Sequence, residues 1–154
     1  MDTLSHAAWG ATMIRKPSLV LWAALAGALP DIIPAIFGIL RWRSEYFRDM
    51  VSQKFAEDPR DSYMIVYRYA HSLLPITLLA AVLAIFYPAW WLVTIPYYLH
   101  IFMDIFTHKG VWGTRLFYPI SDFHIEGRDW WRNKWFSIVN WCVLIVINAI
   151  IFLI

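Results

Sequence analysis

Three side chains that commonly bind metal ions follow one another in the stretch 97–110. His100, Asp104 and His108 are spaced four residues apart in an otherwise apolar segment. Four residues correspond to about 400° of an α-helix, so the three side chains lie along one helix face. An imidazole or a carboxylate in apolar surroundings is costly unless it binds an ion or pairs with another group. The stretch therefore predicts one wall of a metal site inside a membrane.

Further candidate ligands lie in three other segments, at His6, Asp31 and His71. Asp31, His71, His100 and Asp104 each lie about four to ten residues from the cytoplasmic end of the membrane span that is predicted for them below. At helical rise these positions share a layer roughly 6–15 Å deep. A helical hairpin that turns at residues 15–17 would return Asp31 to about the depth of His6. We therefore expect a site that gathers candidates from four segments. The expected metal ligands are His6, Asp31, His71, His100, Asp104 and, at the membrane boundary, His108.

The composition is that of an integral membrane protein. Hydrophobic residues make up 60% of the 154 residues, against about 45–50% in soluble domains, and the mean hydropathy is +0.53. Charged residues are absent from 69–103 and from 135–154, and Asp31 is the only one within 17–40. One span needs roughly 20 apolar residues, so the block 69–103 is expected to divide at Pro88.

The predicted fold is an all-α, polytopic membrane bundle that forms a single domain over residues 1–154. It has about four spans plus a short N-terminal helix at 4–14. The spans are expected at 18–40 with an interruption at 30–34, at 63–87, at 89–107 and at 135–154. Residues 41–62 and 108–134 are expected to be polar loops. Basic residues gather in these two loops, so the positive-inside rule places both on the cytoplasmic side.

Several ordered motifs resemble a known family. They are SHAAWG at 5–10, GALPD at 27–31, RYAHSLL at 68–74, HIFMDIFT at 100–107, GVWG at 110–113 and LFYPI at 116–120. In order and spacing they are similar to the membrane-bound, metal-dependent hydrolase family typified by the bacterial inner-membrane protein YdjM. The resemblance implies a metal-binding helical protein of the inner membrane, related to zinc-dependent phospholipase C-type enzymes. The ligands that it implies are His6, Asp31, His71, His100 and Asp104.

The chain also departs from the pattern of that family. The family usually has a further acid or histidine just after the Pro-Asp pair, where this chain has Ile32, Ile33 and Pro34. His108 is an additional histidine that can compensate. Imidazole and carboxylate ligands suit a divalent metal, with zinc as the first expectation and manganese or iron as the others.

Three side chains are candidates for catalysis. Arg68 lies one helical turn before His71 and can hold a phosphate oxygen. Ser72 can hydrogen-bond the substrate or a ligand, and Asp31, when it is not coordinated, can act as a general base. Together they predict hydrolysis of a lipid phosphoester, a lipid-like substrate taken from the cytoplasmic leaflet, by metal-activated water.

Other interpretations stay open at this point. Each candidate also has a structural role that involves no metal. His71 can be a core histidine, His100 with Asp104 a buried ion pair, and Asp31 a helix cap. His6 and His108 can be solvated histidines, and Arg68 can extend its charge to the membrane interface. Intramembrane histidines and acids also build proton or ion pathways, although a transporter of this size would need a homo-oligomer. A non-catalytic scaffold held together by metal is the third reading. The net charge of +2 gives no indication of a nucleic-acid partner.

Overall fold

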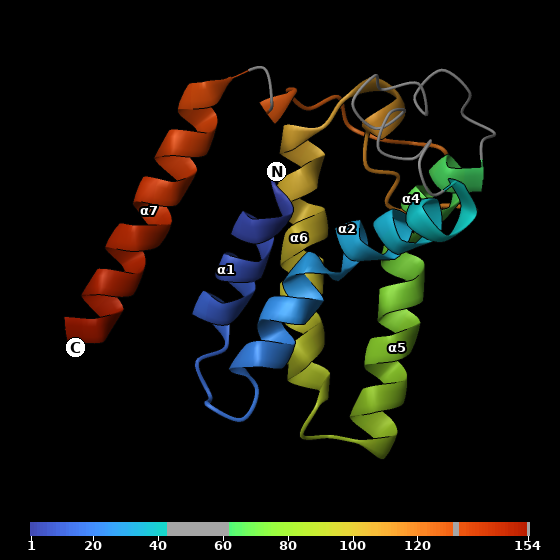
Figure 1. Ribbon diagram of the computed structural model, residues 1–154. Coiled ribbons are helices and arrows are strands. Elements are labelled where there is room, and N and C mark those ends of the chain that lie inside the picture. The colour runs from blue at the N-terminus through green and yellow to red at the C-terminus, as the bar shows by residue number, and fades with distance from the viewer. Residues whose placement is uncertain (43–61, 131–132, 154) are drawn as a thin grey trace.

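The structure, a computed structural model, describes residues 1–42, 62–130 and 133–153 (Figure 1). Every regular element in these ranges is helical, which confirms the all-α membrane fold. The helices are α1 (Thr3–Met13), α2 (Val20–Trp42), α4 (Ser62–Ala70), α5 (Leu73–Phe86), α6 (Ile95–Thr107) and α7 (Lys134–Leu153), with 3-10 turns η2 (Trp91–Thr94) and η3 (Gly110–Trp112). The expected polar loop at 41–62 lies almost entirely outside the described residues.

The described helices supply two or three full-length spans. Helices α2 and α7 are each long and apolar enough to cross a membrane, and α4 with α5 make a third when the bent pair is one span. The fourth expected span, 89–107, is present as η2 followed by the 13-residue helix α6. At about 1.5 Å per residue, α6 alone covers about two thirds of a 30 Å hydrocarbon core.

Helices α1 and α2 form the expected hairpin. The turn is closed by bonds from the amides of Leu19 and Val20 to the carbonyl of Lys16, and the two helices then run side by side (Figure 1). Glycines permit this close approach. A Cβ at Gly10 would lie 2.3 Å from the carbonyl oxygen of Ala23, and one at Gly27 would lie 2.5 Å from the carbonyl oxygen of His6.

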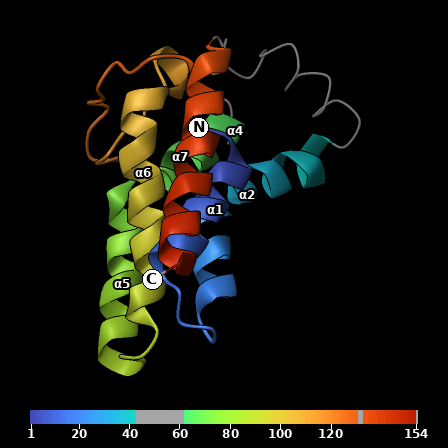
Figure 2. The same cartoon turned by 90° about the vertical axis from the view of Figure 1, so that its left-hand side faces the viewer.

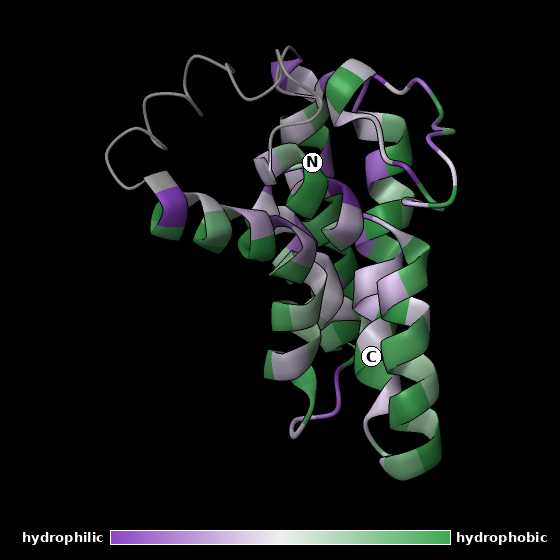
Figure 3. Cartoon of the chain, turned by 90° about the vertical axis from the view of Figure 1, so that its right-hand side faces the viewer, coloured by the Kyte–Doolittle hydropathy of each residue, from purple (hydrophilic) through white to green (hydrophobic). Residues whose placement is uncertain are grey.

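Helix α2 continues through its two prolines, so the expected interruption at 30–34 was wrong. Pro30 and Pro34 both lie inside the helix. A proline removes one helical hydrogen bond and bends the helix without having to end it, and Figure 3 shows the second half of α2 leaving the direction of the bundle. Asp31 therefore sits within a helix and does not cap a new one.

The span expected at 63–87 is broken in its middle. Helix α4 ends at Ala70 and α5 begins at Leu73, with an angle of 48° between them. Ser72 caps α5, because its hydroxyl accepts a hydrogen bond from the amide of Leu74. The backbone freed by the break is bonded to the 113–120 segment, since the amide of Leu73 donates to the carbonyl of Leu116 over 2.9 Å. The break places His71, which is completely buried, between the two helices.

Helix α7 lies on the outer side of α1, at the opposite flank of the bundle from α5 (Figures 1 and 2). Leu144 is the only buried residue of this helix. Hydrophobic residues dominate the lower part of the helices in Figure 3, and hydrophilic residues gather in the upper part with the 108–130 segment. The long outward apolar face of α7 is the surface expected of a helix in lipid.

Candidate metal centre

Four side chains from three regions of the chain meet inside the bundle. Asp31 comes from α2, His71 from the break between α4 and α5, and His100 and Asp104 from α6. One ligand atom of each lies within 4.8 Å of the others. The two histidines and Asp104 have fully buried side chains, whereas the Asp31 side chain is 22% exposed. The convergence expected of these four residues is therefore present in the fold.

Backbone carbonyls orient the two histidines. His71 Nδ1 lies 2.9 Å from the carbonyl oxygen of Tyr67, and His100 Nδ1 lies 2.7 Å from that of Gly27. A carbonyl oxygen only accepts, so each Nδ1 carries the proton and donates. In the neutral ring the Nε2 atom then has a free lone pair, which is the arrangement that metal-binding histidines usually show.

The two Nε2 atoms face each other at 3.2 Å, with carboxylate oxygens on both sides. The Nε2 atom of His71 is 3.5 Å from both Asp31 Oδ1 and Asp104 Oδ2. The Nε2 atom of His100 is 3.7 Å from Asp31 Oδ1 and 3.1 Å from Asp104 Oδ2. Ligands held tetrahedrally around zinc at about 2.0–2.1 Å are about 3.3 Å apart. Five of the six separations, 3.1–3.7 Å, lie near that value, and all four ligand atoms lie within 4.8 Å of one another, so the group is a candidate four-ligand metal site.

The other oxygen of Asp104 anchors that carboxylate. Oδ1 accepts hydrogen bonds from Thr107 Oγ1 at 3.1 Å and from the amine of Met1 at 2.8 Å. His6 Nε2 lies 3.0 Å from the same atom, and His108 Nδ1 lies 3.3 Å from it. These contacts leave Oδ2 to face His71 and His100.

His6 and His108 therefore lie beside the group of four residues that converge, and both contact Asp104. His6 is 2% exposed and its ring stacks on His100, with 3.6 Å between centroids. His108 is 8% exposed, so the solvated surface position considered for it is not what the structure shows. Both histidines are placed to orient Asp104 and, through it, the group.

Asp31 is held from the opposite side. The Thr3 hydroxyl donates to Asp31 Oδ2 over 2.8 Å, while Oδ1 faces the two histidines. The sequence reasoning missed Thr3 and Thr107. The signal for Thr107 was available in its spacing, three residues after Asp104 on the same helix, whereas the contact of Thr3 with Asp31 joins two helices and has no local signal.

The two remaining candidates lie on either side of His71 in the chain, Arg68 near the end of α4 and Ser72 at the start of α5. The Ser72 hydroxyl is buried and lies 3.1 Å from the Leu116 carbonyl and 2.9 Å from the Tyr118 carbonyl. The Arg68 guanidinium is buried in the last turn of α4 and lies 5.9 Å from the centroid of the Tyr118 ring. Both residues contact the 113–120 segment.

A second buried arginine comes from that segment and was not among the candidates. Arg115 donates from Nη1 to the carbonyls of Val111 and Gly113 and pairs with Asp122 over 3.2 Å. Burial and the nearby Arg68 guanidinium lower the pKa of Arg115, and Asp122 opposes that shift. The 113–120 segment thus adds positive charge near the break that carries His71.

With this geometry in place, the chain can be compared with known proteins. The family model of the YdjM inner membrane protein matches residues 1–154, the whole length given. The chain belongs to the YdjM inner membrane protein family. No curated protein and no solved structure matches it. This YdjM family protein is thus related to inner-membrane proteins, in agreement with its apolar helices, and its Asp-His group is a candidate metal site.

Proposed function

We propose that this YdjM family protein is a membrane-embedded, metal-dependent hydrolase that acts on a lipid phosphoester or a related lipid-linked substrate. The observation that carries the proposal is the group of Asp31, His71, His100 and Asp104, in which both histidines bond a backbone carbonyl through Nδ1 and turn Nε2 toward two carboxylates. A divalent ion, with zinc first and manganese or iron as the alternatives, would polarise a phosphoryl oxygen there and acidify a nearby water.

Differences in burial divide the roles within the group. His71, His100 and Asp104 have side chains that are completely buried, so they are assigned to holding the ion. Asp31 is the partly exposed member, and Thr3 holds its outer oxygen. A carboxylate at the open side of a site is placed to accept the proton of an attacking water. The water oxygen would then bond to phosphorus as the ester P–O bond breaks, and the leaving alkoxide would take the proton back from Asp31 and depart as the alcohol.

Two arginines supply the charge that a phosphoryl group requires. Arg68 and Arg115 are both buried at the 113–120 segment, and a guanidinium matches the geometry of phosphate oxygens. Ser72 holds this segment against the start of α5 through the carbonyls of Leu116 and Tyr118. In this assignment Arg68 contacts the substrate, and Ser72 positions the segment beside it.

The membrane supplies the substrate. The large polar segments lie on the cytoplasmic side in this proposal, so the site opens toward the cytoplasmic leaflet. A lipid can then reach the site laterally without leaving the bilayer.

The decisive test is turnover in nanodiscs made of bacterial phospholipids, with chelator-treated protein reloaded with zinc, manganese or iron. Release of a phosphate monoester or of an alcohol should require both the metal and Asp31. Asp31→Asn should keep most of the metal and lose turnover by at least about a hundredfold, because the proton acceptor is removed. Equal turnover by Asp31→Asn and the wild type would contradict the proposed mechanism.

One observation favours a second function, a scaffold with a structural metal. Four protein ligands complete a tetrahedral zinc site, whereas catalytic zinc sites usually keep one position for water. A structural site predicts that Asp31→Asn loses metal together with thermal stability and that no phosphoester is hydrolysed. The same protein samples therefore separate the two functions.

A further inference from the structure

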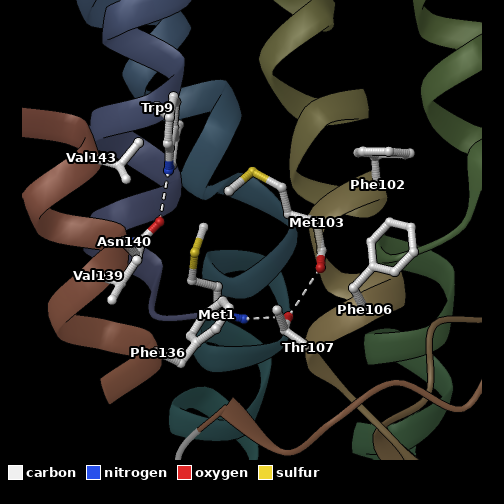
Figure 4. A pocket seen from close by; sticks show the side chains of 10 residues that line it. All are labelled: Met1, Trp9, Phe102, Met103, Phe106, Thr107, Phe136, Val139, Asn140 and Val143. Carbon is white, nitrogen blue, oxygen red and sulfur yellow. Dashed lines mark hydrogen bonds between the residues drawn. The ribbon is translucent and has the colours of Figure 1, made fainter. Parts of the chain in front are cut away.

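A pocket lies between α1, α6 and α7, on the side of α6 that faces away from α5 (Figure 4). Its volume is about 290 Å³ and its lining is almost wholly apolar. This volume is close to the lower limit of small-molecule pockets, about 300 Å³. Helix α7 is fastened to α1 by polar bonds, from Trp9 Nε1 to Asn140 Oδ1 at 3.0 Å and from Asn148 to Thr12 at 2.9 Å.

The inner wall of the pocket is shared with the candidate metal centre. Thr107 and Met1 line the pocket, and both donate hydrogen bonds to Asp104 Oδ1. At the outer rim, Phe102 and Phe106 are more than half exposed. The pocket therefore leads from the outer surface of the bundle to the residues that anchor Asp104.

The depth of the pocket indicates what surrounds it. The pocket residues of α7 lie between positions 136 and 143, within about 14 Å of the helix start at Lys134. Helix α7 is long and apolar enough to span the membrane, so this stretch lies in one leaflet of the hydrocarbon core. The molecules at that depth are lipid chains.

The side-chain amide of Asn140 indicates which class of lipid the pocket would bind. Asn140 lines the pocket, and its Oδ1 accepts a hydrogen bond from Trp9 Nε1. Its Nδ2 is buried and has no hydrogen-bond partner within the described part of the chain. An unpaired amide donor in an apolar environment is costly. A carbonyl oxygen that entered with the chain would satisfy it.

We propose that this pocket binds one acyl chain of a diacyl phospholipid, with the ester carbonyl accepting a hydrogen bond from Asn140 Nδ2 and the headgroup directed toward the metal centre. The proposal rests on the proposed hydrolase function for the use of the lipid, and it names the substrate class as an acyl ester lipid. An isoprenoid phosphate lacks that carbonyl and leaves the Asn140 amide unpaired.

The test is photo-crosslinking of the full-length protein in phosphatidylethanolamine and phosphatidylglycerol nanodiscs, with a trace phosphatidylethanolamine that carries a diazirine in one acyl chain. Mass spectrometry should find label on the pocket-lining peptides of α6 and α7. Val143→Phe, which fills the pocket, should lower that labelling at least about tenfold. Val146→Phe adds the same ring to α7 outside the pocket and should leave labelling unchanged.

A second pair of variants tests the role of the Asn140 side-chain amide in lipid binding. Asn140→Leu should weaken labelling about fivefold to tenfold, the change expected for loss of one buried hydrogen bond. Asn148→Leu also removes an asparagine that bonds α1, but Asn148 lies outside the pocket. This variant should be labelled by the lipid probe as strongly as the wild type is. In competition, unlabelled diacyl lipid should displace the probe better than the dialkyl ether lipid of equal chain length.

The possible failures are distinguishable. Label spread evenly over the outer face of α7, or equal labelling of Val143→Phe and Val146→Phe, would overturn the pocket assignment. A crosslink between two copies of α7 would assign the surface to a second copy and overturn it as well. Specific labelling without phosphoester turnover would leave the pocket in place and refute the hydrolase.

Discussion

The Nε2 atoms of His71 and His100 lie 3.2 Å apart, while the Nδ1 atom of each ring is bonded to a backbone carbonyl. Neutral rings in this arrangement turn two lone pairs toward each other inside an apolar bundle, which is unfavourable without a cation between them. Protonated rings paired with Asp31 and Asp104 would be the buried ion-pair alternative. The two cases differ in one measurable quantity, the metal content.

Loss of one histidine of the pair should remove the metal. We expect about one divalent ion per purified wild-type chain and at least a tenfold lower content in His100→Ala, since the remaining ligands no longer surround the ion. Elemental analysis by inductively coupled plasma mass spectrometry gives the ratio. His124→Ala, a histidine of the polar segment outside the group, should keep the wild-type content. Equal metal in both variants would favour the ion pair.

Chelation should lower the thermal stability of the protein. The three assigned ligands join the α4–α5 break to α6, and Asp31 of α2 faces them, so an ion bound to the folded state stabilises the packing of these elements. At a free metal concentration a hundredfold above Kd, the stabilisation is about 2.7 kcal/mol. Light-scattering or tryptophan melts in detergent should show Tm falling on chelation and recovering with zinc. In His71→Ala the same treatment should leave Tm unchanged, and a shift of wild-type size there would exclude this site as its cause.

Thr3→Val should impair Asp31 without releasing the metal. The variant keeps the shape of the side chain and removes the hydroxyl that donates to Asp31 Oδ2. Outer hydrogen-bond partners of such sites are typically worth 10–100-fold in affinity or activity, so we expect turnover to fall about tenfold. Thr12→Val is the matched control on the same helix, because the Thr12 hydroxyl bonds the Ala8 carbonyl and Asn148 rather than Asp31. Identical turnover in both variants would show that Asp31 needs no such support.

Gly10→Ala should destabilise the α1–α2 hairpin. Alanine in place of glycine usually stabilises a helix by about 0.5–1 kcal/mol. Here the added Cβ would lie 2.3 Å from the Ala23 carbonyl oxygen and would push the helices apart. We expect a net loss of about 1–3 kcal/mol, as for other overpacked sites, measured by denaturation in mixed detergent. A gain in stability would mean that the helices are farther apart than described.

Acid should loosen the contact between Glu126 and η3. The Gly110 amide, which donates to Glu126 Oε2 over 3.1 Å, and His124 lower the pKa of Glu126 below its usual range. A carboxyl whose pKa is lowered by folding stabilises the fold above its unfolded pKa. That contribution is lost as the pH falls from about 4.3 through the lower folded value. Exchange of the Gly110 amide, normalised to its intrinsic rate, should therefore speed up on acidification, and Glu126→Gln should abolish that dependence.

Much of the bundle could be predicted from charge and hydropathy. Residues 134–153 form the helix that an uncharged apolar block predicts. The turn at 15–17 brings α2 back along α1, as expected. The step of four from His100 to Asp104 was sufficient to place both on one face of α6, because helical geometry fixes that relation. The joint position of His71 and Asp31 followed from their shared depth.

The predictions that were wrong concern features that depend on tertiary contacts. The prolines of α2 were expected to end the helix, but a proline inside a helix that packs on its neighbours bends it instead. Ser72 and Pro75 are local marks of a helix start after Ala70, but the partner of the freed backbone is Leu116, more than forty residues later, and local sequence does not indicate it. The burial of His108 likewise depends on tertiary structure at the end of α6, where the Gly127 amide donates to the His108 carbonyl.

The break between α4 and α5 also sets an order of assembly. Unpaired backbone amides are costly in lipid, and the partners of Leu73 and Ser72 are the carbonyls of Leu116 and Tyr118. Those residues leave the ribosome more than forty positions after the break itself. Helices α1, α2 and α4 can therefore enter the bilayer before the break at His71 meets these partners. The backbone support of the break is thus synthesised after the metal-group side chains, and a chain truncated before residue 116 would carry all four of them without the carbonyls that hold the break beside His71.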